Sequence, residues 1–450
     1  NIEVLGGTLS LAGGSSVGAN GLIEVGEQGN LSLLGNLAVA GTLDLNNGAT
    51  INLANNATAN LSGGKLELAG THGLDGITTD NATTLQINSS GGISRTDNGT
   101  STVGNLVLSQ AGSSSGVSFG VDNMSLTVGG TAQFNDADIT LNSANLNFQN
   151  SPTFDNGSTL SVKNSGELIL QSGATINDSS LDFTSSTFKP SGAVSLTGSS
   201  AFTLNDTSSV KLEGETTFTQ SGTVLWPSID LNASTLTLEV TEMYCCLHQS
   251  GGLVIRTGET IKLGTSKLTV DNTLRIDNGG TLSSGSGALE IGGALTLDGE
   301  LAQGGGILNL ILGGSVGTTG ELDVKDSELK LGDELSFAGT LVVNSGTSWS
   351  GLGGTVDLSE GTLESGGGTF NLDDFTIGAN STFRLSGDTE ISSASDLTLG
   401  NLELGGNKLS LDFASVNNAT LILPNTLAMD TAGSIIDTGD SSLTLSNALQ

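Results

Sequence analysis

Short segments in which apolar and polar residues alternate fill this sequence from end to end. Examples are TLSL, TLDL, TINL, KLEL, SLTV and ELIL, each with two apolar residues two positions apart. Gly, Asn, Asp or Ser flank these segments. Alternation between turn-forming residues is typical of short, half-buried β-strands. No sustained i, i+3, i+4 pattern predicts a helix, so we expect an all-β chain.

The apolar positions recur with a period of about 21 residues and form ladders, here meaning sets of like positions one period apart. One ladder advances in steps of 20, 22, 20 and 22, and a second in steps of 21, 21, 21 and 22. Two isolated pairs, Leu268 with Leu289 and Phe383 with Leu404, are also 21 apart. The predicted core ladders are Phe134, Phe154, Ile176, Leu196 and Phe218; Ile139, Leu160, Leu181, Phe202 and Val224; Leu146, Leu168, Phe188, Val210 and Leu231; and Leu253, Leu274 and Leu295.

Three ladders with one period predict three strand faces per coil, each stacked on the same face of the next coil. The expected fold is a single-stranded parallel β-helix, or β-solenoid, with about 21 residues in each of about 21 coils. Right-handed coiling follows from the preference of parallel crossovers. We expect residues 1–450 to form one continuous solenoid. Because the sequence opens and stops within repeats, we also expect it to be a fragment of a longer secreted protein.

The composition agrees with a repeated β-coil and excludes some classes of binding partner. The chain has 67 Gly and 4 Pro, as expected where turns need positive φ and ladder strands need their N–H groups. Its net charge of −33 repels phosphate backbones, so no nucleic-acid partner is expected. No apolar run approaches the roughly 20 residues of a membrane span, so none is predicted.

The segments GTLDLNNGATINL and GGTLSLAGG resemble the passenger repeats of bacterial autotransporters and filamentous-haemagglutinin-like adhesins. The resemblance implies an extracellular or cell-surface β-solenoid exoprotein. Its expected role is a structural or adhesive shaft without catalysis, whose partner is a host or neighbouring-cell surface. The alternative is a subunit of an extracellular filament or sheath, whose partners are other copies joined end to end by strand pairing.

Enzyme chemistry is not expected. A β-helical polysaccharide enzyme needs clustered carboxylates beside Lys or Arg in one groove, and the 13 basic residues here are scattered. Such a groove would revive this third interpretation. No catalytic residue, metal site or cofactor is predicted.

Residues 241–250, TEMYCCLHQS, differ from the rest of the chain because they hold both cysteines and the only tyrosine. Leu231 and Leu253 are 22 apart, the length of one ordinary coil, so we predict an atypical strand in phase with its neighbours rather than an inserted loop. This strand would continue the second ladder through Leu247 to Leu268.

Alternation within that strand points Cys245 inward and Tyr244, Cys246 and His248 outward. We therefore predict no disulfide between Cys245 and Cys246, which would face opposite ways. Cys245 would act as a small buried hydrophobe in an eccentric coil. The alternative function is a surface contact made by Tyr244, Cys246 and His248, since one Cys and one His are too few ligands for zinc.

Overall fold

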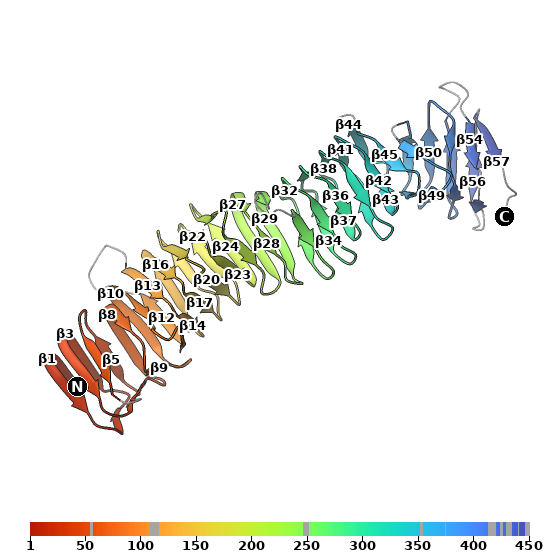
Figure 1. The fold of residues 1–450 in the computed structure, drawn as a ribbon. Coiled ribbons are helices and arrows are strands. Elements are labelled where there is room, and N and C mark those ends of the chain that lie inside the picture. Colours follow the sequence, from red (N-terminus) through yellow and green to blue (C-terminus); the bar gives the residue numbers. More distant parts are fainter. Residues whose placement is uncertain are drawn as a thin grey trace. The chain divides into compact units, whose positions relative to one another are not determined.

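Every regular element of the described chain is a β-strand, and these strands pair in parallel with strands of neighbouring coils. The computed structural model describes residues 1–54, 57–108, 117–245, 252–351, 354–373, 375–412, 420–423, 426–428, 434–439 and 441–445. Within these residues there is no helix, and strands stacked about 21 residues apart form a β-solenoid of about 19 turns. The predicted all-β parallel solenoid is confirmed. The chain divides into two compact units, Asn1–Ser221 and Gly222–Gln450, each a stack of coils (Figure 1).

From Ser125 to Thr197 three sets of strands build three faces, because each strand there pairs with the third strand after it. The first set is β16 (Ala137–Asn142), β19 (Thr159–Lys163), β22 (Ser180–Thr184) and β25 (Ala201–Leu204). The second is β15 (Ala132–Asn135), β18 (Thr153–Asp155), β21 (Ala174–Asn177), β24 (Gly192–Thr197) and β27 (Thr216–Trp226). The third is β14 (Ser125–Val128), β17 (Asn145–Phe148), β20 (Glu167–Leu170), β23 (Thr187–Pro190) and β26 (Ser209–Lys211). Nearer the N-terminus, β3 (Leu22–Leu33), β5 (Thr42–Leu45) and β8 (Lys65–Gly73) stack in the same way.

The second unit repeats this plan. One face contains β29 (Thr235–Cys245), β31 (Thr260–Lys262), β34 (Thr281–Gly285), β37 (Glu300–Gln303), β40 (Glu321–Asp323) and β43 (Thr340–Val343). Another continues from β29 through β32 (Lys267–Val270), β35 (Leu289–Ile291), β38 (Ile307–Leu310) and β41 (Glu328–Leu331). The third contains β30 (Leu253–Ile255), β33 (Leu274–Ile276), β36 (Leu295–Leu297), β39 (Gly314–Val316) and β42 (Leu335–Phe337).

Stacked apolar side chains fill the interior, and every residue of the predicted ladders is buried. Phe134 pairs in register with Phe154, and their rings stack with centroids 4.8 Å apart. The same pairing joins Leu146 to Leu168 and Leu253 to Leu274. Register stacking of like residues therefore supplies a continuous apolar core inside each unit.

In these coils one predicted ladder step and one predicted isolated pair name the wrong register partner. Phe218 pairs with Val194 rather than Leu196, because the coil between β24 and β27 is longer than the mean period. Phe383 pairs with Leu402 rather than Leu404, because the coil between β49 (Thr382–Leu385) and β52 (Asn401–Glu403) is shorter. Each error is two positions, an even number, so the side chains concerned still point inward and remain buried.

Candidate functional site

Tyr244 lies half-buried on the outward side of β29, and its neighbour Cys245 points into the core, fully buried. These orientations agree with strict alternation along the strand. Tyr244 pairs in register with Thr269 of β32. Cys246, Leu247 and His248, the other residues of the expected contact strand, lie outside the described residues.

The coil that holds Tyr244 is longer than predicted. Met243, and not Leu247, pairs with Leu268, so this step advances the numbering by 25. The next step, from Leu268 to Leu289, advances it by 21. The expected place of Leu247 beneath Leu268 is therefore wrong. The ordinary spacing of Leu231 and Leu253 did not reveal this extra length. Neither residue lies in β29, and the longer step is the one from β29 to β32.

Cys245 is disulfide-bonded, so the prediction that no disulfide forms here is wrong. The chain's only other cysteine, Cys246, lies outside the described residues. The prediction relied on alternation continuing past Cys245, but the described strand β29 ends at that residue.

A network of charged and polar side chains surrounds Tyr244. Lys267 Nζ lies 2.6 Å from Glu242 Oε1 and 3.3 Å from Glu290 Oε2. The pKa of the Glu242 carboxyl is lowered because its carboxylate accepts hydrogen bonds from two groups. The Lys267 ammonium has the larger effect and the Tyr244 hydroxyl the smaller. The Tyr244 hydroxyl that donates to Glu242 has a raised pKa, because the acceptor is an anion. We call Glu242, Tyr244, Lys267, Thr269 and Glu290 the Tyr244 surface.

Thr269 forms the floor of the Tyr244 surface. It faces outward between Tyr244 and Glu290, its register neighbours, yet is only 6% exposed. Its hydroxyl makes no hydrogen bond within the described part of the chain. The surface thus offers an aromatic ring, two carboxylates and an ammonium group on one strand face.

A second feature is a hollow of about 340 Å³ at a row of corners in the second unit, lined by Glu300 and Glu321. Corner 298–299 has two residues, whereas the corners on either side, 277–280 and 317–320, have four. The short corner between two long ones leaves the hollow. Its lining includes Asn278, Gly279 and Thr319 from the long corners.

The two carboxylates of this hollow are register neighbours on adjacent strands. The pKa of the Glu321 carboxyl is raised, first by its partial burial and then by nearby negative charges. These charges belong to Glu300, Asp323 and Glu364. No Lys or Arg is among the described residues that line the hollow.

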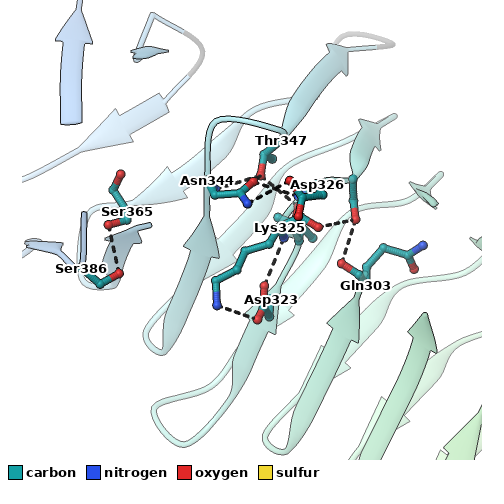
Figure 2. A network of polar contacts seen from close by, with 10 residues as sticks. Gln303, Asp323, Lys325, Asp326, Asn344, Thr347, Ser365 and Ser386 are labelled. Carbon is teal, nitrogen blue, oxygen red and sulfur yellow. Dashed lines mark hydrogen bonds and ion pairs between the residues drawn. The ribbon is translucent and has the colours of Figure 1, made fainter. Parts of the chain in front are cut away.

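Polar side chains at other corners connect one coil to the next. The Ser327 hydroxyl donates to the Gln303 carbonyl of the preceding coil at 2.7 Å. Asn344 Nδ2 donates to Asp326 Oδ1 at 3.0 Å, also between coils, and Figure 2 shows this pair. Gln303 is 2% exposed, and its amide Nε2 donates to the Gly287 carbonyl at 2.6 Å. These bonds satisfy buried polar groups at the corners, so we assign the network a structural role.

The described part of the chain meets neither the requirements of a metal centre nor those of a membrane-spanning helix. Among the residues that the structure describes, no three His, Cys, Asp or Glu side chains are placed to hold a metal ion. In the same ranges, no helix has the length and apolar character needed to cross a membrane.

Sequence reasoning identified Tyr244 but missed Glu242, Lys267 and Glu290, because the charge pairing depends on the long step between β29 and β32. The hollow did leave a readable signal: the corner sequences DNGG, DG and GTTG differ in length. Comparisons with protein-family models, with curated proteins and with solved structures found no match to this chain.

Proposed function

We propose that this chain is a non-catalytic, extracellular β-solenoid shaft that holds or presents adhesive surfaces at a bacterial cell surface. The observation that carries the proposal is the in-register stacking of strand faces in both units, which repeats one simple coil. The resemblance of the repeats to adhesin passengers points the same way. The net charge of −33 keeps such surfaces solvated.

The Tyr244 surface is the contact region we assign to this shaft. Aromatic rings are favoured in protein contacts, since they bring a large area with few rotatable bonds. Here a tyrosine stands among charged groups on a strand face, in a chain with only one tyrosine and two tryptophans. Its partner would be a host or neighbouring-cell surface.

Sedimentation velocity over a wide concentration range, with electron microscopy of the same samples, tests the shaft. We expect a single elongated monomer at all concentrations. Objects that grow end to end with concentration would replace the shaft by a filament subunit. A compact particle of low frictional ratio would contradict both.

Adhesion is tested with beads that carry the purified chain, applied to candidate cells. Tyr244→Ala should reduce bead retention several-fold, because it removes the aromatic ring from the contact region. The matched control is Thr203→Ala, at an exposed outward position of β25, which should leave retention unchanged. Equal retention by the unaltered chain and Tyr244→Ala would remove this contact from the proposal.

A further inference from the structure

Five Asn-Gly pairs occur in the chain, at residues 20–21, 47–48, 98–99, 156–157 and 278–279. In such a pair the glycine nitrogen can attack the asparagine side-chain amide, since glycine has no side chain to hinder the approach. Three of the pairs share the sequence Asp-Asn-Gly, at 97–99, 155–157 and 277–279. Sequence alone therefore gives these three sites the same immediate neighbours, and only the structure separates them.

Three of the five glycine nitrogens are engaged in hydrogen bonds. Gly99 N donates to Asp97 Oδ1 at 2.8 Å, and Gly157 N donates to the Asp178 carbonyl of the next coil at 2.7 Å. Gly21 N donates to the Gly18 carbonyl at 2.7 Å. A nitrogen held this way must break its hydrogen bond before it can lose its proton and turn toward the asparagine.

The other two glycine nitrogens, of Gly48 and Gly279, donate to no partner in the described residues. Their corners are closed instead by the following residue: Ala49 N donates to the Asn46 carbonyl at 2.9 Å, and Gly280 N to the Asp277 carbonyl at 2.8 Å. Asn47 and Asn278 are both exposed. Both attacking nitrogens are thus free in solvent-accessible corners.

The asparagine side chains show the same contrast between protected and free corners. Asn156 Nδ2 donates to Asn135 Oδ1 at 2.5 Å, which fixes its amide away from the backbone. Asn98 and Asn156 also have positive φ values of 52° and 53°, whereas Asn278 does not lie in that region. The Asn278 side chain makes no hydrogen bond to any described residue, so it is free to rotate toward Gly279 N.

We propose that Asn47 and Asn278 are sites of spontaneous intramolecular deamidation, and that the other three Asn-Gly pairs are protected by the fold. The glycine nitrogen bonds to Cγ of the asparagine, the Cγ–Nδ2 bond breaks, and ammonia leaves with the proton of the glycine N–H. The product is a five-membered imide. Water then opens either of its two carbonyls and yields aspartate or isoaspartate, so the sequence needs no oxidant, cofactor or enzyme.

At Asn278 the modification changes the hollow described above. A third carboxylate is added beside Glu300 and Glu321, in a place that already disfavours negative charge. Isoaspartate also adds one backbone methylene to a corner that is tied to the preceding coil. There, Thr257 Oγ1 donates to the Asn278 carbonyl at 2.6 Å and Gly258 N to the Gly279 carbonyl at 2.9 Å.

The test is to incubate the purified full chain, folded, in mildly alkaline buffer and to follow all five sites by peptide mass spectrometry. An isoaspartyl methyltransferase label reports the isoaspartate product. We expect Asn278 and Asn47 to deamidate several-fold faster than Asn98, Asn156 and Asn20. Synthetic peptides of the three Asp-Asn-Gly corners should react at similar rates, which shows that the difference arises from the fold.

Two outcomes would overturn the proposal. One is equal deamidation rates at Asn278 and Asn156 in the folded chain. The other is that the synthetic peptides deamidate in the same order of rates as the sites in the folded chain. The variant Asn278→Gln should abolish the label at that corner and leave the signal of Asn47 unchanged. Persistence of the label on the 278 peptide in this variant would also contradict the assignment.

Discussion

Single carboxylates in this protein acquire their properties from the residues one strand above and below. Glu24, Asp44 and Glu67 are register partners on β3, β5 and β8, so three acidic groups stand in one row. Burial of Asp44, then the charges of Glu67 and Glu24, raises its pKa to about 6, while Lys65 acts in the opposite direction. Stacking in register therefore concentrates like charges as effectively as it concentrates like apolar side chains.

Asp44 makes the first unit less stable above pH 6. Its folded-state pKa lies above the ordinary value of 3.8, so the folded form binds this proton more tightly than the unfolded form. The stabilisation is present below about pH 4 and is lost as the pH rises to about 6. Asp44→Asn should raise the free energy of unfolding at pH 7.5 by on the order of 1 kcal/mol, after discounting for solvent screening. Denaturant unfolding from pH 4 to 8 measures this.

The control for Asp44→Asn is Asp182→Asn. Asp182 is exposed on β22, and its register neighbours are the uncharged Ser161 and Thr203. Its removal should leave the pH dependence of unfolding between 4 and 6 unchanged. If the two variants give the same pH profile, the row of carboxylates is not the cause.

A core phenylalanine tests the stacked ladder. Phe154 is fully buried between Phe134 and Ile176, and its ring stacks on that of Phe134. Phe154→Ala should cost about 3–5 kcal/mol of unfolding free energy, since it leaves a cavity in a packed interior. Phe154→Leu should cost clearly less. Equal losses in equilibrium unfolding would show that volume at this position is not what stabilises the coil.

At the scale of elements, the sequence predicted strands and their orientation better than it predicted register. Alternation alone placed Phe134, Leu160 and Tyr244 on the correct side of their strands, because this property depends only on parity. Register depends on how many residues each corner holds, and a mean period does not contain that information. This is why Phe218 and Leu247 were given the wrong partners, and why the charge pairs of Lys267 were not foreseen.

Close stacking also decides which glycines can be replaced. Gly173 and Gly157 have nearly equal φ values, 82° and 84°. A β-carbon on Gly173 would lie 1.8 Å from the Ala193 carbonyl oxygen of the next coil, while one on Gly157 would meet nothing within 4 Å.

Gly157→Ala should therefore cost only the backbone strain of positive φ, about 1 kcal/mol, and Gly173→Ala distinctly more, because the two coils must separate. Thermal unfolding of both variants compares them. Similar shifts in melting temperature would mean that φ, and not the distance between coils, makes glycine necessary at residue 173.

For the whole molecule, charge is the property that sets its behaviour in solution. Acidic residues outnumber basic ones by 46 to 13, and the isoelectric point is about 4.1. Mutual repulsion opposes the association of separate copies at neutral pH, and this repulsion weakens as the net charge approaches zero.

We therefore expect the chain to remain dispersed at pH 7 in low salt and to associate near pH 4. Dynamic light scattering during a pH titration checks this, and a return to pH 7 should reverse the association. Association at pH 7 in low salt, without change near pH 4, would show that contacts other than charge govern it.

The variable corners of the solenoid have a practical consequence. Steps of 19, 21, 24 and 25 along the numbering coexist with intact strand pairing, as the pairs Phe383 with Leu402, Leu268 with Leu289, Val194 with Phe218 and Met243 with Leu268 show. Strands thus keep the scaffold constant while corners absorb changes of length. A foreign peptide grafted into corner 317–320, one of the long corners, should be displayed without refolding its neighbours, and grafts in successive coils would space such peptides one strand apart. The corners thus allow peptides to be placed at chosen intervals along a stack of coils.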